Sequence, residues 1–302
     1  MDVPRNGTRL YYPSRVAAPL EIAVPIITIL ALLAVGLDLT PADFSKVWQH
    51  PGIVAAGLFT PLVTLPPLAV GLIAIFKPPP AVQGGLLLIA ACPIGGISNT
   101  YSYLAGASVA LSITLTAISS LLAAATIPLL DRAIGVLWGT PLGLTAPIPL
   151  IVAQLIVMLG LPVSAGMWIR ARWPQFALRS QAIFRAAAFA GLGVLMTLII
   201  GGNPSGFLSS LRDTVPLGIA FVAGSFAVGW LAARLIGTTA PDRFTLATEF
   251  ATRNVAVATA IAVTLLHRVE FALFATAYLL IEIPMMMAAI VIYRRRRDAT
   301  EH

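Results

Sequence analysis

Long apolar runs alternate with short polar connections along the chain. A run of about 20 apolar residues is long enough to cross a lipid bilayer as a helix. Turn-forming stretches such as Pro78-Pro79-Pro80 separate the runs. We therefore expect an all-α polytopic membrane protein with roughly nine transmembrane helices. The expected spans are 19–37, 52–76, 82–104, 107–130, 146–169, 182–200, 215–236, 244–266 and 270–293.

Two of these spans contain residues that interrupt a helix, at 92–99 and at 249–254. Lipid cannot satisfy the backbone groups that a broken helix frees, so each break must line a site enclosed by protein. The N-terminus of a half-helix favours an anion, and freed carbonyl groups favour a cation. This pattern is typical of secondary transporters.

The order of spans around the breaks repeats along the chain. Residues 52–130 read as helix, broken helix, helix, and residues 215–293 read the same way. The spans at 146–200 separate the two triplets and permit them to insert with opposite topology. We expect an inverted-repeat core in which the two breaks cross near the membrane centre.

Composition excludes several other classes of protein. Hydrophobic residues make up 58% of the chain and charged residues 10%, with a mean hydropathy of +0.92, too apolar for a soluble fold. The net charge of +7 comes without a basic stripe interleaved with aromatic residues, so we expect no nucleic acid partner. No obligate protein partner is evident; the expected surroundings are the lipid bilayer.

No catalytic set is visible within the spans. The three histidines fall in loops or in the tail, and no aspartate lies in the middle of a span. An intramembrane protease would need such groups, so we do not expect an enzyme. The single cysteine, Cys92, excludes an internal disulfide and reads as a small packed residue.

The distribution of Lys and Arg predicts the orientation. Residues 294–302 begin with four arginines directly after an apolar span, which reads as a basic cytoplasmic tail. With nine spans, the polar N-terminal tail 1–18 then lies outside. Ten Lys and Arg residues fall on the side of the basic tail and seven on the opposite side, which supports this topology modestly.

Polar residues gather at the two breaks. Ser98 and Asn99 lie just past the first break, and Ser112 and Thr116 share one face of the next helix because they are four residues apart. Glu249 is the one carboxylate at the second break, and it is costly there unless it meets a cation. Hydroxyl residues in membrane helices often bond only to their own backbone, but their combination with Glu249 favours a cation site.

These residues resemble the bile acid:sodium symporter family. The resemblance covers nearly the whole chain and is most specific at the first break. It implies a core domain formed by the two triplets, a panel domain formed by 19–37 and 146–200, and a cavity between them that alternates in access. The short stretch before the first span resembles the nine-helix form, which predicts a bacterial inner membrane protein. The resemblance is carried by Ala91 to Pro93, Gly95-Gly96, Ser98-Asn99, Tyr103-Leu104-Ala105, Ala110-Leu111-Ser112, Glu249 and Asn254.

The same resemblance implies one sodium site and the loss of a second. In sodium symporters of this family, two glutamines contribute to the second site, and their positions here hold Pro61 and Arg253. Arg253 is four residues after Glu249 and is expected to pair with it, either as a built-in cation or as a structural ion pair. We therefore expect coupling to at most one sodium ion, or none. The implied sodium ligands are Ser98, Asn99, Ser112, Thr116 and Glu249.

The expected cargo is a small or amphipathic organic anion, a carboxylate or a sulfonate, whose identity the sequence leaves open. Two other residues carry charge inside expected spans. Glu282, beside Pro284, is a possible proton site, or it pairs with a helix-end donor or with Arg253. Its segment also resembles the arsenite exporters of the same superfamily. An oxyanion exporter and a proton-coupled carrier therefore remain as alternatives. Arg185, near the start of its span, is expected to snorkel toward the interface. The expected substrate-binding residues are Gly95, Gly96, Asn99, Arg253 and Asn254.

Overall fold

The computed structural model describes residues 14–38, 40, 51–139, 148–202 and 204–301, and within them no extended strand is present. The helices in chain order are α1 Ser14–Asp38, α3 Pro51–Phe76, α4 Pro80–Ala91, α5 Ile97–Ala105, α6 Val109–Trp138, α7 Ile148–Leu155, the π-helical η1 Ile156–Gly160, α8 Leu161–Arg172, α9 Pro174–Gly202, α10 Pro204–Leu235, α11 Ala240–Ala251, α12 Val255–Ala260, the π-helical η2 Ile261–Leu265 and α13 Val269–Glu301.

Five of the described helices are long and apolar enough to cross a membrane. They are α3, α6 over Val109–Leu137, α9, α10, and α13 over Val269–Arg297. Large apolar side chains such as Val63, at 71% exposure, and Phe59, at 59%, lie on the surface of the helix bundle. Lipid accepts such surfaces at no cost, whereas water does not. The expectation of an all-α integral membrane protein is confirmed.

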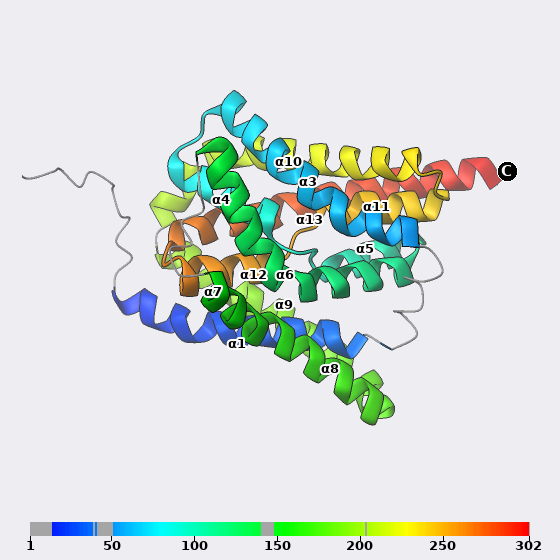
Figure 1. Ribbon diagram of the computed structural model, residues 1–302, viewed down its shortest axis with the longest axis horizontal. Coiled ribbons are helices and arrows are strands. Elements are labelled where there is room, and N and C mark those ends of the chain that lie inside the picture. The colour runs from blue at the N-terminus through cyan, green and yellow to red at the C-terminus, as the bar shows by residue number, and fades with distance from the viewer. Residues whose placement is uncertain (1–13, 39, 41–50, 140–147, 203, 302) are drawn as a thin grey trace, which may run out of the picture.

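The helices form two packed groups. In one group, α1 packs on α8 and α9; in the other, α10 packs on α3, α11 and α13, and α4 packs on α13. Figure 1 shows α1 and α8 on one side of the molecule and α3, α10 and α13 on the opposite side. The first group comes from the segments expected to form the panel, and the second from those expected to form the core.

Two glycines permit the close contact between α1 and α8. A Cβ atom at Gly166 would lie 2.8 Å from the Cα atom of Gly36, closer than packed atoms allow. Small residues at such a crossing let two membrane helices approach backbone to backbone. This contact holds α8 against α1.

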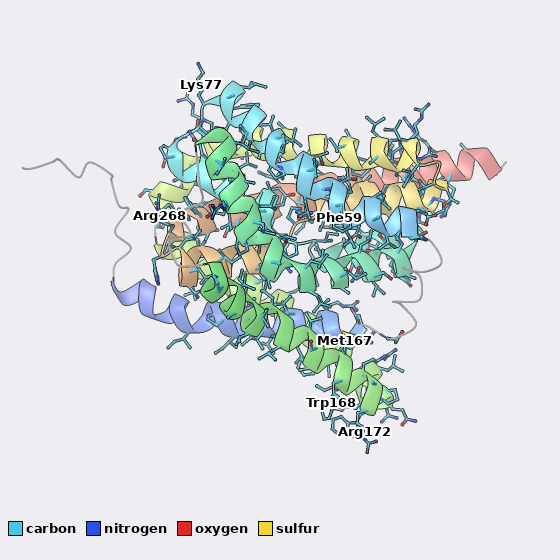
Figure 2. The ribbon with its side chains drawn as sticks, in the orientation of Figure 1. Phe59, Lys77, Met167, Trp168, Arg172 and Arg268 are labelled. Atoms are coloured by element: carbon cyan, nitrogen blue, oxygen red, sulfur yellow. The ribbon has the colours of Figure 1, made fainter. Side chains whose placement is uncertain are left out.

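Basic side chains lie at both ends of the long axis. Lys77 and Arg268 lie toward the end where α1 begins, and Arg172 lies toward the opposite end (Figure 2). The expected topology places Lys77 and Arg268 on the side of the membrane opposite the basic tail, and Arg172 on the side of the tail.

Some boundaries differ from the expected ones. The helix α1 begins at Ser14, inside the predicted tail 1–18, whose residues 1–13 lie outside the described part of the chain. The basic segment 294–302 continues α13 as far as Glu301, because no glycine or proline ends the helix after Pro284.

Candidate functional site

The two helix breaks meet and satisfy each other's backbone groups. Between α4 and α5 the chain is extended, as it is between α11 and α12, and Ile94 and Arg253 form an isolated antiparallel bridge. The Gly95 N–H donates to the Thr252 carbonyl at 3.1 Å, and the Asn254 N–H donates to the Pro93 carbonyl at 2.9 Å. The groups that lipid would leave unpaired are thus paired across the crossing.

Local chemistry explains why the chain can cross here. A Cβ atom at position 95 would lie 2.8 Å from the Arg253 carbonyl oxygen, so the close approach requires glycine. The Asn254 side chain caps α12 by accepting from the Val257 N–H at 3.1 Å. The Tyr278 hydroxyl donates to the Ala251 carbonyl at the end of α11. The ends of α11 and α12 at the crossing therefore each have a defined side-chain partner.

Beside the crossing lies a cluster of buried oxygen atoms, which we call the oxygen cluster. The Ser112 hydroxyl lies 2.8 Å from Asn99 Oδ1 and within hydrogen-bond distance of Glu249 Oε1. The Thr116 hydroxyl lies 3.3 Å from Glu249 Oε2 and 3.3 Å from the Ser98 hydroxyl. All five side chains are less than 9% exposed. The structure therefore brings together the five residues predicted as sodium ligands: Ser98, Asn99, Ser112, Thr116 and Glu249.

The charge of the oxygen cluster is unbalanced. Its hydrogen bonds to Glu249 come from neutral hydroxyl groups, and no ion pair to Glu249 forms among the described residues. A buried carboxylate is costly unless a cation or strong donors compensate it. Hydroxyl, amide and carboxylate oxygens are the ligands that a hard cation prefers, so the residue types fit sodium.

Arg253 does not form the ion pair that the sequence predicts with Glu249. The i, i+4 spacing would hold on a continuous helix, but α11 ends at Ala251 and the following residues are extended. The guanidinium instead donates from Nη2 to the Cys92 carbonyl, at the C-terminal end of α4, where the helix dipole favours a cation. Arg253 is 3% exposed, and its Nε and Nη1 atoms make no hydrogen bond with the described residues.

Arg253 also lies next to Pro61. The two residues line a small cavity together with Cys92, Pro93 and Ser119. These are the positions at which the family resemblance predicts a missing second sodium site. Neither side chain carries an oxygen atom, and the structure brings the two positions to one place.

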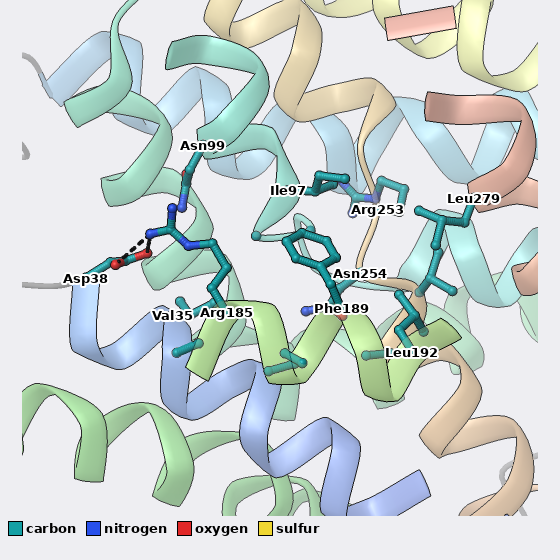
Figure 3. Close-up of a pocket in the computed structure, with 17 residues that line it drawn as sticks. Val35, Asp38, Ile97, Asn99, Arg185, Phe189, Leu192, Arg253, Asn254 and Leu279 are labelled. Carbon is teal, nitrogen blue, oxygen red and sulfur yellow. Dashed lines mark hydrogen bonds and ion pairs between the residues drawn. The ribbon is translucent and has the colours of Figure 1, made fainter. Parts of the chain in front are cut away.

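A larger pocket lies between the two helix groups, and we call it the interhelical pocket (Figure 3). It has about 720 Å³ of empty space, part of it open. Apolar side chains of α1 and α9, such as Val35 and Phe189, form one wall, and the two breaks form the other. All five predicted substrate-binding residues line it: Gly95, Gly96, Asn99, Arg253 and Asn254.

The pocket also contains a charged pair that the sequence reasoning missed. Arg185 on α9 contacts Asp38 on α1, with Nη2 to Oδ1 at 2.9 Å and to Oδ2 at 2.8 Å (Figure 3). The sequence predicts that Arg185 snorkels toward the interface, but it does not predict this contact, which holds the guanidinium beside Asp38 at the edge of the pocket. The sequence signal for this pair was the presence of opposite charges, Asp38 and Arg185, near the ends of two expected panel spans.

Glu282 is fully buried on α13. Its two carboxylate oxygens make no hydrogen bond with the described residues. The hydroxyl groups of Thr252 and Tyr101 lie near the Glu282 carboxylate and also have no hydrogen-bond partner among the described residues. Glu282 does not pair with Arg253, because no ion pair between them forms among the described residues.

Crossed, broken helices that enclose a cluster of hard oxygen atoms define a class of membrane transport protein. Comparison with known proteins identifies the family. Residues 25–210, more than half of the chain, match the sodium bile acid symporter family, and the protein belongs to that family. The predicted family is therefore confirmed, and its members are transporters rather than enzymes.

The relatives are described as sodium-dependent carriers. A probable sodium/metabolite cotransporter of Arabidopsis thaliana, BASS1, is 27% identical over 74% of this chain and 55% of its own length. A sodium-dependent organic anion transporter of Bos taurus is 28% identical over 76% of this chain and 62% of its own length. The uncharacterized sodium-dependent transporter YocS of Bacillus subtilis is 26% identical over 76% of this chain and 70% of its own length. The chain thus spans less than two thirds of the plant and bovine proteins.

Proposed function

We propose that this protein is a secondary active transporter of an organic anion, a carboxylate or a sulfonate, working by alternating access. The observation that carries the proposal is the crossing of two broken helices between the interhelical pocket and the oxygen cluster. The relatives named above include a sodium-dependent organic anion transporter, which agrees in class.

The proposed architecture has nine spans. The triplets 52–130 and 215–293 form inverted repeats of a core domain, each with one broken helix. The panel comprises 19–37 and 146–200, and its helices α1, α8 and α9 pack on one another. Movement of the panel against the core would open the interhelical pocket to each side of the membrane in turn.

The proposed coupling ion is sodium, held by the oxygen cluster. Four neutral oxygen donors and one carboxylate would surround a monovalent cation and compensate Glu249. Because Asn99 reaches both the oxygen cluster and the interhelical pocket, sodium bound in the cluster would stabilise the wall on which the anion binds.

We further propose that Arg253 replaces a second sodium ion. Its guanidinium is buried and carries a permanent positive charge. It lies close enough to Glu249 to interact electrostatically with the carboxylate. A second cation in the same cavity would meet like-charge repulsion at low dielectric. Coupling is therefore to one sodium ion at most, or the carrier is independent of sodium.

A proton-coupled carrier is the second candidate, because Glu282 is buried with no cation beside it in the described structure. A protonated Glu282 would remove the cost of a bare charge. Nothing favours the arsenite exporter, since soft oxyanion chemistry would rest on the single thiol of Cys92, which is buried.

The proposed location is a bacterial inner membrane, with the N-terminus outside and the C-terminus cytoplasmic. The deciding experiment is uptake of labelled pyruvate, benzoate and taurocholate into proteoliposomes. Sodium and proton gradients are imposed separately. Uptake driven by sodium and lost in Glu249→Gln supports the proposal. Uptake driven only by a proton gradient and lost in Glu282→Gln favours the second candidate, and no uptake of any organic anion would refute both.

A further inference from the structure

The ion pair between Arg185 and Asp38 leaves most of the guanidinium unused. A single nitrogen, Nη2, contacts both carboxylate oxygens, at 2.9 and 2.8 Å. Nε and Nη1 make no hydrogen bond with the described residues. A guanidinium binds a carboxylate most strongly through two parallel N–H bonds from two nitrogens. Arg185 can therefore offer an incoming anion a better contact than the one Asp38 makes.

The exposure of the two side chains favours replacement of Asp38 by an incoming anion. The Arg185 side chain is 41% exposed and the Asp38 side chain 11%. An ion pair that is open to solvent on the arginine side is weak, because water screens it and the long side chain must be held in place. Both residues line the interhelical pocket, and Figure 3 shows the Arg185 side chain extending from α9 along its wall toward Asp38.

We propose that Arg185 binds the carboxylate or sulfonate group of the transported anion, and that Asp38 occupies Arg185 when no anion is bound. This assignment rests on the proposed function and adds a specificity-determining residue to its pocket. When the substrate binds, its anionic group replaces the Asp38 carboxylate at the Arg185 guanidinium. Asp38 acts as a competitor, so Arg185 is not free to hold inorganic anions in the resting state of the pocket.

A second cation can compensate Asp38 after Arg185 is released. Arg170 on α8 lies close enough to Asp38 to interact electrostatically with its carboxylate. Its Nη1 atom is buried and makes no hydrogen bond with the described residues. The displaced carboxylate therefore stays compensated, which lowers the cost of the exchange.

The exchange would also connect the two helix groups. Asp38 and Arg185 both lie in the group of α1, α8 and α9. On the opposite wall lie the N-terminal end of α5 and the side chain of Asn254. An anion held by Arg185 on one wall and by these groups on the other bridges the pocket. Binding of the anion then couples directly to the relative position of the two groups.

The first test measures the electrostatics of the pocket without needing the natural substrate. Cys92 is the one cysteine of the chain and is buried, so a cysteine introduced at pocket-lining Ala188 provides a single accessible thiol. Its labelling rate is measured with anionic sulfonatoethyl methanethiosulfonate and with the cationic trimethylammonium analogue. The readout is the ratio of the anionic rate to the cationic rate.

We expect Arg185→Gln to lower this ratio and Asp38→Asn to raise it, each by on the order of tenfold for a unit charge close to the thiol. The double variant should return the ratio toward that of the unmodified pair. Arg179→Gln is the matched control, because Arg179 is exposed on the same helix and does not line the pocket. An unchanged ratio in both single variants, or a shift in the same direction, would overturn the proposal and leave a purely structural pair.

The second test separates this proposal from the proposed function. For an anion that the unmodified protein transports, Asp38→Asn should lower KM and Arg185→Gln should raise it. Arg185→Lys should recover only part of the loss, because lysine lacks the two-nitrogen fork. Equal loss of transport in Asp38→Asn and Arg185→Gln would refute anion binding by Arg185 alone. Absence of organic anion transport in the unmodified protein would refute the function, while the labelling ratios would still show whether Arg185 and Asp38 set the charge of the pocket.

Discussion

Ile94 and Arg253, which lie far apart in the chain, pair as an antiparallel bridge between two broken helices. The backbone bonds on either side of this bridge are 2.9 and 3.1 Å long. A displacement of one break must therefore move the other. The bridge ties the two breaks together beside the interhelical pocket, which Asn254 lines.

Glu249→Gln should strongly weaken the response to sodium. The substitution keeps the shape of the side chain but removes the one negative charge of the oxygen cluster. Interactions with a charged partner contribute about 1.5–3 kcal/mol, so apparent sodium affinity should fall by roughly ten- to a hundredfold. The measurements are sodium-dependent uptake and the sodium-induced rise in Tm of the purified protein.

Glu270→Gln is the matched control for this experiment. Glu270 lies at the start of α13, outside the oxygen cluster, and pairs with Arg268. It should keep the sodium response of the unmodified protein. A normal sodium response in Glu249→Gln at normal expression would exclude Glu249 from the coupling mechanism.

Gly166→Ala should destabilise the contact between α1 and α8. The added methyl group would meet the backbone of Gly36 at 2.8 Å, and neither helix can yield without moving the whole interface. Overpacking of this kind costs about 1–3 kcal/mol. The measurement is the Tm in detergent, which should fall. Gly193→Ala, where nothing lies within 4 Å, should leave Tm unchanged or slightly raised. Equal Tm values for the two variants would show that the helices are not in close contact.

Much of the crossing could be predicted from sequence because its signals are local. The clustering of Pro93 with Gly95 and Gly96 favours a helix break, and the spacing of Ser112 and Thr116 fixes one helix face. Hydroxyl, amide and carboxylate groups at the breaks then indicate a hard cation. The structure places these groups within hydrogen-bond distance of one another.

The pairing of charges could not be predicted in the same way. The expected contact between Arg253 and Glu249 assumed that a helix continued through residue 253, but α11 ends before it. The contact between Asp38 and Arg185 depends on which faces of α1 and α9 meet, and this is a property of the packed bundle. The spacing of residues along one helix can be read from the sequence. The contacts between residues on separate helices depend on how the helices pack.

The orientation of the chain is open to a direct test. We expect the N-terminus outside and the end of α13 in the cytoplasm, because nine spans and the arginines at 294–297 require both together. Fusions of a reporter to each end should give opposite sides of the membrane. Removal of the four positive charges should weaken the preference, while glutamine at exposed Arg212 should not. Both ends on the same side would contradict the nine-span topology.

Arg253 should limit the coupling to one sodium ion. Its guanidinium is buried beside Pro61, donates to the Cys92 carbonyl and leaves two nitrogens without a partner in the described structure. A second sodium ion at this place would have to displace a permanent charge of the same sign. The Hill coefficient for sodium in uptake should therefore be near one, or uptake should persist when choline replaces sodium.

Arg253→Gln should restore part of a second sodium site, because it supplies an amide oxygen and removes the repelling charge. The Hill coefficient should rise above one, but recovery should be incomplete because Pro61 still has no side-chain oxygen. Arg243→Gln on the same helix group is the control, since Arg243 bonds to the Thr238 carbonyl outside both cavities. Cooperative dependence on two sodium ions in the unmodified protein would show that the guanidinium does not take the place of a cation at the crossing.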